Sequence, residues 1–147
     1  MTRIGMVVLL LCALFSVNCY AQQASAPSPL KDFQGFWAEF RAAVKADDKE
    51  KIASMTAFPF RVKGFDDDDA VKRYEKAQFL KILDRLLDID SGENLAEEKM
   101  RVFIDRKAEV NTKDLRDGGS KASLGNFIFE RVKGKWTFTM ANGYLEN

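Results

Sequence analysis

The sequence predicts an α+β domain in which N-terminal helices pack on a curved antiparallel sheet that ends in a β-hairpin. Three observations support this fold class. Apolar residues recur at helical spacing in the first part of the chain, and they alternate with polar residues near its end. The pair Lys133-Gly134 separates the two last alternating segments, and a two-residue loop of this kind is typical of a tight hairpin.

Residues 1–21 have the layout of a secretory signal peptide. Arg3 gives a basic start, an apolar run extends from Met6 to Phe15, and Ala21 occupies a small-residue position that a signal peptidase reads. The apolar run is too short to span a membrane. We therefore expect cleavage after Ala21, a periplasmic or secreted product, and no stable membrane span in that product.

Cleavage would remove Cys12 and Cys19, and the whole chain has no histidine. Cys19 allows a lipid-anchored alternative, but Ser16 and Asn18 do not match the aliphatic and small residues that a lipid-attachment site requires. The exported domain would lack disulfides, and Ser-His-Asp or Cys-His catalysis is excluded. Without cysteine or histidine a zinc site would need carboxylates alone, so we expect no metal centre. No Gly-rich phosphate loop is present, and we expect no cofactor.

The charge of the processed chain is balanced. Loss of Arg3 leaves as many basic as acidic residues, 22 of each. Such a chain has no electrostatic reason to bind nucleic acid. The acidic run from Asp66 to Asp69 does not match a calcium-binding loop, because Ala70 and Val71 stand where a ligand and a glycine are required. We interpret this run as a solvated turn.

The helical elements follow from spacing and capping signals. Residues 22–29 are rich in Ala, Ser, Pro and Gln, which indicates a disordered lead-in before a single domain over 30–147. Asp47 and Glu50 form a capping box for a short second helix. A longer helix is expected over about 74–89, and the first helix, over about 30–45, has an apolar stripe of Phe33, Phe36, Trp37, Phe40 and Val44.

Strand signals lie between and after these helices. Residues 58–63 alternate between apolar and basic side chains, which predicts a strand with one solvent face. Segment 95–105 fits either a short helix capped by Asn94 or a strand, and residues 108–112 are interpreted as a strand. The last hairpin joins 123–132 to 135–144. Its loop places Arg131 opposite Trp136, Phe129 opposite Phe138 and Phe127 opposite Met140, all on one face that the first helix covers.

Several short motifs occur in a recognisable order: Phe36-Trp37-x-x-Phe40, Asp47-Asp48-Lys49, Phe58-Pro59-Phe60, Phe79-Leu80-x-x-Leu83-Asp84 and the stretch from Lys133 to Phe138. In this order they resemble the small exported bacterial proteins of the nuclear transport factor two-like, or ketosteroid-isomerase-like, superfamily. The resemblance covers about residues 30–144. It implies a cone-like curved sheet around helices with a pocket at the open end, where family enzymes place Asp, His or Tyr.

This interpretation places a candidate ligand pocket between the first helix and the final hairpin. The aromatic residues there either form core or line the pocket. Arg61 could orient an anionic group, the hydroxyls of two tyrosines suit the pocket mouth, and Arg131 is expected to stack on Trp136. The candidate ligand-binding residues are Trp37, Phe40, Phe60, Arg61, Tyr74, Phe127, Trp136 and Tyr144.

The function that the sequence favours is a non-catalytic exported domain that binds a small apolar or amphipathic ligand or acts as an accessory scaffold. One alternative is a protein–protein module, such as an inhibitor or immunity protein of an envelope enzyme, with the sheet face or the acidic turn as its contact surface. A second alternative is a carboxylate-based isomerase or hydrolase, which requires a buried carboxyl group with a raised pKa.

Cleavage after Ala21 is expected to leave a processed protein that starts at Gln22. Mass spectrometry and N-terminal sequencing of the protein recovered from the producing cells check this expectation. A product that starts at Cys19 and carries a lipid would contradict it, because that product is the lipid-anchored alternative.

Overall fold

The computed structural model describes residues 28–93 and 97–145. The predicted signal peptide with both cysteines, most of the predicted lead-in, and Asn94 lie outside the described residues. The elements are, in chain order, α1 (Pro29–Lys45), α2 (Lys49–Ser54), β1 (Thr56–Lys63), β2 (Lys72–Tyr74), α3 (Lys76–Leu87), α4 (Met100–Arg106), the 3-10 turn η1 (Thr112–Asp114), β3 (Leu115–Arg116), the 3-10 turn η2 (Asp117–Gly119), β4 (Lys121–Leu124), β5 (Phe127–Val132) and β6 (Lys135–Asn142).

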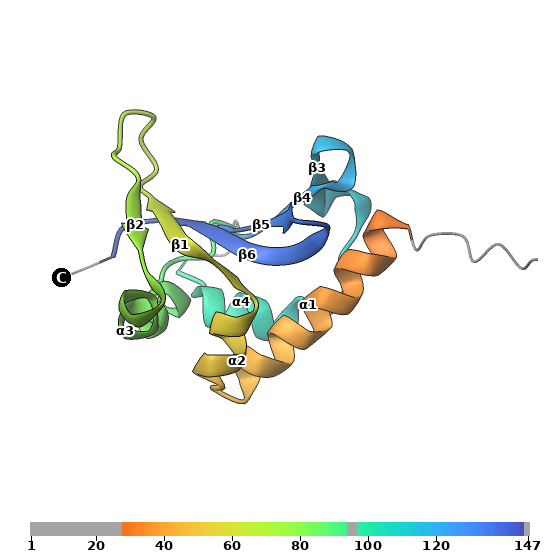
Figure 1. Cartoon of the computed structure of the whole chain (residues 1–147), viewed down its shortest axis with the longest axis horizontal. Coiled ribbons are helices and arrows are strands. Elements are labelled where there is room, and N and C mark those ends of the chain that lie inside the picture. The colour runs from red at the N-terminus through yellow and green to blue at the C-terminus, as the bar shows by residue number, and fades with distance from the viewer. Residues whose placement is uncertain (1–27, 94–96, 146–147) are drawn as a thin grey trace, which may run out of the picture.

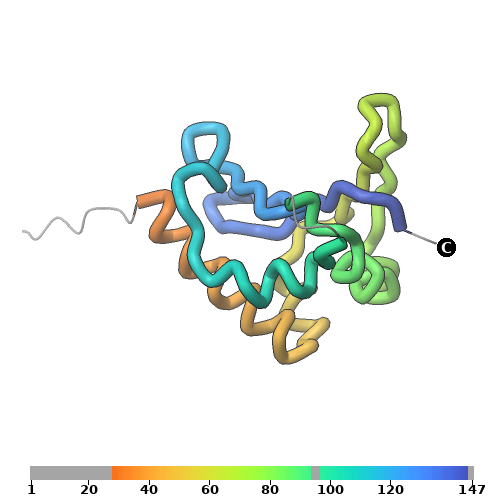
Figure 2. The backbone as a smooth tube through the Cα atoms, turned by 180° about the vertical axis from the view of Figure 1, so that it is seen from behind, coloured from red at the N-terminus to blue at the C-terminus, as the bar shows by residue number. Residues whose placement is uncertain are grey.

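The strands form one open six-stranded sheet in the order β2-β1-β6-β5-β4-β3, with the α-helices on one side of it (Figures 1 and 2). The α+β class is therefore confirmed. The sheet is mixed and not wholly antiparallel as predicted, because β6 lies parallel to β1 and antiparallel to β5. After β1 the chain passes through β2, α3, α4 and the strands β3 to β5. The last strand, β6, then inserts between β1 and β5.

Helix α1 forms as predicted and covers the hairpin. The Ser28 hydroxyl accepts a hydrogen bond from the Lys31 amide at 3.3 Å, and Pro29 occupies the first turn, where its missing N–H costs nothing. The ring of Phe33 lies 4.6 Å from that of Trp136, measured between centroids, and the Phe40 ring lies 5.3 Å from the Phe129 ring. The aromatic stripe of α1 therefore packs on and covers one face of the β5–β6 hairpin.

The residue that caps α2 differs from the prediction. Asp48, not Asp47, accepts the hydrogen bond from the Lys51 amide, at 2.9 Å. Asp47 takes a left-handed conformation with φ of 52°, which turns the chain sharply between α1 and α2. The tight connection shifts the cap by one residue.

The structure also corrects the middle of the chain. Residues 72–74 form the short edge strand β2, so Tyr74 precedes helix α3 and does not belong to it. The ambiguous segment 95–105 contributes to a helix, α4. Residues 108–112 do not form a strand. The side chain of Gln34 on α1 supplies the partners that a neighbouring strand would provide, since it donates to the Ala108 carbonyl at 3.1 Å and accepts from the Val110 amide at 2.8 Å.

The hairpin register is confirmed near the turn and wrong further away. Arg131 pairs with Trp136 and Phe129 with Phe138, around a turn in which Lys133 and Gly134 both have positive φ. A bulge then shifts the pairing by one, so Phe127 lies opposite Ala141 and not Met140. The extra residue is accommodated at Thr139, whose hydroxyl donates to the Ile128 carbonyl at 3.2 Å.

A second turn was missed in the same region. The predicted strand over 123–132 is divided into β4 and β5 at Gly125-Asn126, where Gly125 has φ of 54°. The residues after this turn pair back onto β4, and Phe129 lies opposite Ala122. The turn therefore adds a strand that the alternation of apolar residues alone did not reveal.

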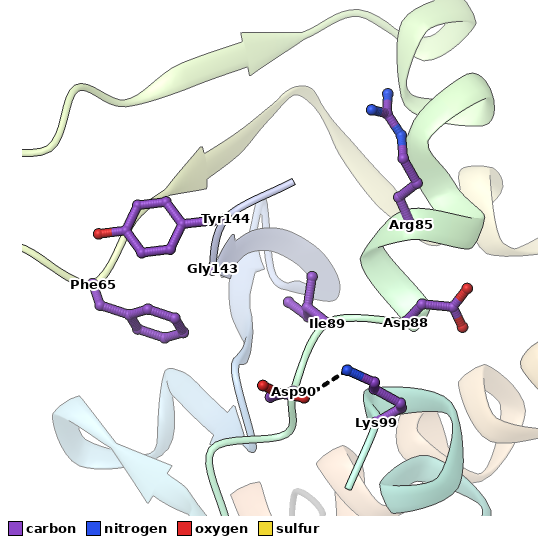
Figure 3. Close-up of a pocket in the computed structure, with 8 residues that line it drawn as sticks. All are labelled: Phe65, Arg85, Asp88, Ile89, Asp90, Lys99, Gly143 and Tyr144. Atoms are coloured by element: carbon purple, nitrogen blue, oxygen red, sulfur yellow. Dashed lines mark hydrogen bonds and ion pairs between the residues drawn. The ribbon is translucent and has the colours of Figure 1, made fainter. Parts of the chain in front are cut away.

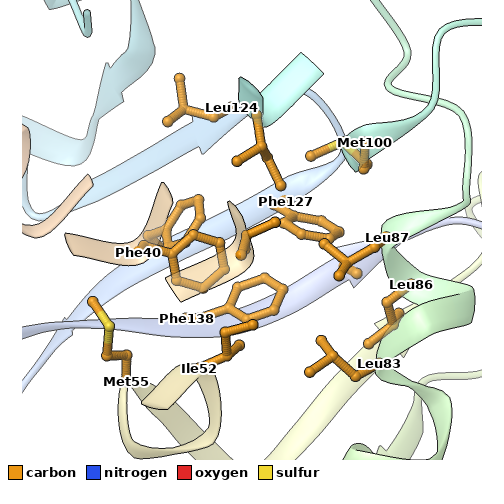
Figure 4. Close-up of a cluster of buried hydrophobic side chains, with 14 of the residues drawn as sticks. Phe40, Ile52, Met55, Leu83, Leu86, Leu87, Met100, Leu124, Phe127 and Phe138 are labelled. Atoms are coloured by element: carbon orange, nitrogen blue, oxygen red, sulfur yellow. The ribbon is translucent and has the colours of Figure 1, made fainter. Parts of the chain in front are cut away.

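The aromatic rings of the core converge on Phe138 (Figure 4). Its ring centroid lies 4.6 Å from those of Phe60 and Phe127, 5.2 Å from that of Phe129 and 5.3 Å from that of Phe40. All of these side chains are fully buried. Phe138 therefore joins β1, β5 and α1 through one side chain of β6.

The substitution Phe138→Ala is expected to lower the free energy of unfolding by about 3–5 kcal/mol, because it leaves a cavity where these rings meet. Val132→Ala, at a position 40 % exposed on the same hairpin, is the control and is expected to cost about 0.5 kcal/mol or less. Urea denaturation measures both values. Equal costs for the two variants would contradict the central role of Phe138.

Candidate functional site

Most of the predicted ligand-binding residues belong to the core. The side chains of Trp37, Phe40, Phe60 and Phe127 are fully buried, and Trp136 is 7 % exposed. All five belong to the hydrophobic core, where the Trp37 ring stacks on the Phe40 ring and the Phe60 and Phe127 rings both contact Phe138. We assign these five residues to packing.

Two polar groups of this core have different surroundings. The Trp37 indole N–H donates to the Lys107 carbonyl at 2.7 Å. The Trp136 indole N–H is buried and has no partner among the described residues. The Arg131 guanidinium lies 5.5 Å from the centre of the Trp136 ring, as predicted for a cation–π pair.

Arg61 lies on the face of the sheet that points away from the core. Its guanidinium donates to the Glu130 carboxylate at 2.5 Å across the sheet, and both side chains are about one-third exposed. Arg61 is therefore paired away from the other candidate residues. Three of the eight predicted residues lie outside the core. Two of these three, Tyr74 and Tyr144, line a common cleft beside the end of β6.

A surface cleft, called here the main cleft, lies between the end of β6 and helix α3 (Figure 3). Its volume is about 530 Å³. One wall is aromatic, the floor consists of the Ile89 side chain and the Gly143 backbone, and the opposite wall is charged. The lining residues are Phe65, Arg85, Asp88, Ile89, Asp90, Lys99, Gly143 and Tyr144.

The aromatic wall is positioned by the C-terminal segment. The Gly143 amide donates to the Lys63 carbonyl at 2.8 Å, which holds the segment after β6 against β1. The Tyr144 hydroxyl then donates to the Asp69 carboxylate at 2.7 Å. A Cβ atom at Gly64 would lie 2.0 Å from the Asp69 carboxylate and 2.5 Å from the Tyr144 ring, so only glycine allows this approach.

Phe65 completes the aromatic wall. Its ring meets the Tyr144 ring edge to face, with centroids 5.5 Å apart and an interplanar angle of 77°. Phe65 is 58 % exposed and Tyr144 is 54 % exposed. Two large rings in contact with each other and with water present apolar surface to a ligand.

The floor and the charged wall come from the end of α3 and the start of α4. Ile89 is 8 % exposed, and its carbonyl accepts from the Met100 amide at 2.8 Å. Next to it, the Lys99 ammonium donates to the Asp90 carboxylate at 2.8 Å (Figure 3). Arg85 comes from the last turn of α3 and also lines the cleft.

A second cleft of about 270 Å³ lies on the other side of Tyr144. It has more apolar side chains and fewer charged ones than the main cleft. Gly143 and Tyr144 belong to both linings. The lining residues of the second cleft are Val62, Gly64, Asp69, Ala70, Lys72, Tyr74, Gly143, Tyr144 and Leu145.

The electrostatics around Tyr144 stabilise a neutral hydroxyl beside an ionised carboxylate. The hydrogen bond from Tyr144 lowers the pKa of Asp69, helped by the bond from the Asp66 amide. The same bond raises the pKa of Tyr144. Elsewhere in the described residues, a bond from Arg106 lowers the pKa of Glu98 and a bond from Lys45 lowers that of Asp105. A carboxyl group that acts as a general acid needs a raised pKa, which is the opposite of the shift at these three carboxyl groups.

Sequence reasoning did not single out Phe65, Arg85, Ile89 or Lys99. Phe65 offered the one usable signal, since a large aromatic directly before an acidic run in a turn has no nearby apolar stripe to join. Arg85 lies on the solvent side of α3. Its proximity to Phe65 and Tyr144 arises from tertiary contacts, which spacing along the chain does not reveal.

Comparisons with known proteins return no matching family model, no similar curated protein and no similar solved structure. The resemblance to the nuclear transport factor two-like superfamily therefore stays a prediction. No helix within residues 28–93 and 97–145 is long and apolar enough to cross a membrane. In the same part of the chain, no cluster of three or more acidic, cysteine or histidine side chains is arranged to hold a metal ion.

The contact between Tyr144 and the β1–β2 loop is expected to be strongest near neutral pH. The lowered pKa of Asp69 means that the contact is present above the ordinary carboxyl pKa and is lost as pH falls through the folded-state value. The raised pKa of Tyr144 means that the contact is present below the ordinary tyrosine pKa and is lost as pH rises through the folded-state value.

The amide chemical shifts of Gly64 and Asp69, followed by NMR across the pH range, measure both transitions. Tyr144→Phe keeps the ring and removes the hydroxyl, so it is expected to abolish the alkaline transition at these amides and to raise the pKa of Asp69. Shifts that are identical in both proteins at every pH would show that the hydrogen bond does not form in solution.

Proposed function

We propose that this protein is an exported, non-catalytic domain that binds a small amphipathic molecule in the main cleft. The observation that carries the proposal is the pairing of an exposed aromatic wall, Phe65 with Tyr144, with a charged wall that includes Arg85 and Lys99. The proposal keeps the ligand class inferred from the sequence and moves the site from the packed core to the end of β6.

The aromatic wall supports binding of an apolar group. Burial of apolar surface contributes about 25 cal/mol per Å², so a ligand that covers both exposed rings gains free energy that neither ring gains within the fold. The cleft volume of about 530 Å³ falls within the range of roughly 300–1,000 Å³ that is typical of small-molecule sites.

The charged wall supports recognition of an anionic group. The two carboxylates already have cationic neighbours, since Asp90 accepts from Lys99 at 2.8 Å and Asp88 lies 4.0 Å from the Arg101 guanidinium. Arg85 and Lys99 also interact with protein neighbours. A guanidinium and an ammonium each have several N–H donors, so both can bind an anion in addition to these partners. The planar guanidinium matches a carboxylate especially well.

The walls are held in place before any ligand arrives. The floor is tied by the Met100–Ile89 backbone hydrogen bond, and the aromatic wall is tied by the Gly143–Lys63 and Tyr144–Asp69 hydrogen bonds. A preformed site avoids the entropy cost of ordering its side chains on binding. This rigidity favours a binding site over an incidental surface depression.

A second candidate is a protein–protein module that contacts an envelope enzyme. The specific observation is the β1–β2 loop, which stands away from the rest of the molecule (Figures 1 and 2). The loop exposes Phe65 and Val71 beside the acidic run Asp66 to Asp69. An exposed aromatic at the base of a projecting loop is typical of a contact anchor.

Titration of the ¹⁵N-labelled processed protein with sodium octanoate, followed by NMR, tests the ligand site. Octanoate is expected to shift the amides of Ile89, Lys99 and Gly143, with octyl glucoside as the uncharged control. Phe65→Ala is expected to weaken octanoate binding about tenfold through lost apolar contact. Val102→Ala, on α4 at 56 % exposure, is matched to Phe65 in exposure and is expected to leave binding unchanged.

The absence of any shift with octanoate would contradict the ligand proposal. The second candidate predicts this absence together with stoichiometric capture of an envelope protein by the native chain and loss of that capture in the Phe65→Ala variant. Equal effects of the Phe65 and Val102 substitutions would show that octanoate binds without specificity.

A further inference from the structure

The main and second clefts lie next to each other and share part of their lining. Gly143 and Tyr144 are the residues common to both linings, and glycine contributes no side chain. The Tyr144 ring, 54 % exposed, therefore borders both a space of about 530 Å³ and a space of about 270 Å³. Displacement of this ring would join the two spaces.

The two clefts differ in chemistry. The main cleft has four ionisable side chains, Arg85, Asp88, Asp90 and Lys99, opposite its aromatic wall. The second cleft begins at Val62, which is 4 % exposed, and continues along Ala70, Tyr74 and Leu145. Its two charged residues are Asp69, which holds the Tyr144 hydroxyl, and Lys72 on the edge strand β2. Polarity therefore falls from the main cleft to the second cleft.

The Tyr144 ring is held by one polar contact and by shape. The Tyr144 hydroxyl donates to Asp69 at 2.7 Å and lies 3.3 Å from Asp66. Gly64 leaves room for the ring on the side of the second cleft, because a Cβ atom there would overlap it. Loss of the hydrogen bond would leave the ring held by its edge contact with Phe65 and by its backbone, so the ring could move aside without disturbing the sheet.

We propose that the second cleft is the apolar subsite of the same binding site, that Tyr144 is its gate, and that the ligand is a single-chain amphiphile with a carboxylate head. The head binds beside Arg85 and Lys99, and the chain passes the Tyr144 ring to reach Ala70 and Leu145. This inference rests on the proposed ligand site in the main cleft. It adds the length of the ligand, the direction in which it lies and the residue that admits it.

A series of straight-chain carboxylates from butyrate to decanoate, each below its micelle concentration, tests the inference. The processed full chain is titrated with each compound and followed by NMR and calorimetry. Affinity is expected to rise by up to about fourfold for each added CH₂ group that is fully buried. Decanoate is expected to shift the amides of Ala70 and Leu145, whereas butyrate is expected to shift only those of the main cleft.

Two variants separate the gate from the subsite. Tyr144→Phe keeps the ring but removes the hydrogen bond that closes the gate, and it is expected to tighten decanoate binding about tenfold relative to butyrate binding. Ala70→Phe fills the second cleft and is expected to abolish the gain with chain length while butyrate still binds. Ala42→Phe, on the exposed face of α1, makes the same substitution elsewhere and serves as the control, with circular dichroism as the check of folding.

The outcomes distinguish this inference from the proposed function on which it rests. If butyrate and decanoate bind equally well, or if Ala70→Phe leaves decanoate binding unchanged, the second cleft is not a subsite although the main cleft binds carboxylates. If no carboxylate of the series binds, both proposals fail. If octylammonium binds more tightly than octanoate, the head of the ligand is a cation and the assignment to Arg85 and Lys99 is wrong.

Discussion

The packing of α1 on the β5–β6 hairpin is the contact on which the rest of the structure depends. The Phe129 ring alone lies within 6 Å of the rings of Phe33, Phe36, Trp37 and Phe40, measured between centroids. These rings fill the space between helix and sheet, so packing holds the core, and residues 28–93 and 97–145 contain no cysteine. Because these rings fill the centre of the fold, the clefts described above lie at its periphery.

The parallel position of β6 beside β1 decides where that concave surface forms. The end of β6 lies against the start of the β1–β2 loop, so residues 75 positions apart in the sequence, Asp69 and Tyr144, form a hydrogen bond. The bulge at Thr139 shifts the register just before this point. One strand therefore does two things: its middle anchors the core through Phe138, and its end builds the aromatic wall of the main cleft.

The shifted carboxyl pKa values among the described residues all favour the ionised form. In the described residues, the carboxyl groups with shifted pKa values, Asp69, Glu98 and Asp105, accept hydrogen bonds that stabilise their ionised forms. The Tyr144 hydroxyl is in turn kept neutral by Asp69. These groups act as fixed acceptors and donors that position backbone and rings, and the proposed amphiphile site makes use of that fixed geometry.

The sequence by itself determined the α+β class, helix α1 with its buried stripe, the hairpin turn at Lys133-Gly134 and the pairing next to it, because each depends on local periodicity or turn chemistry. Only the tertiary structure decided the parallel β1–β6 pair, the bulge at Thr139 and the role of Gln34 in replacing a strand partner, since these arise from contacts between distant segments. The residues of the candidate site divide in the same way between those that the sequence indicated and those that tertiary structure brought together. Tyr144 was recognisable as a tyrosine outside any apolar stripe, whereas Phe65 and Arg85 line one cleft with it only because the last strand inserts beside the first.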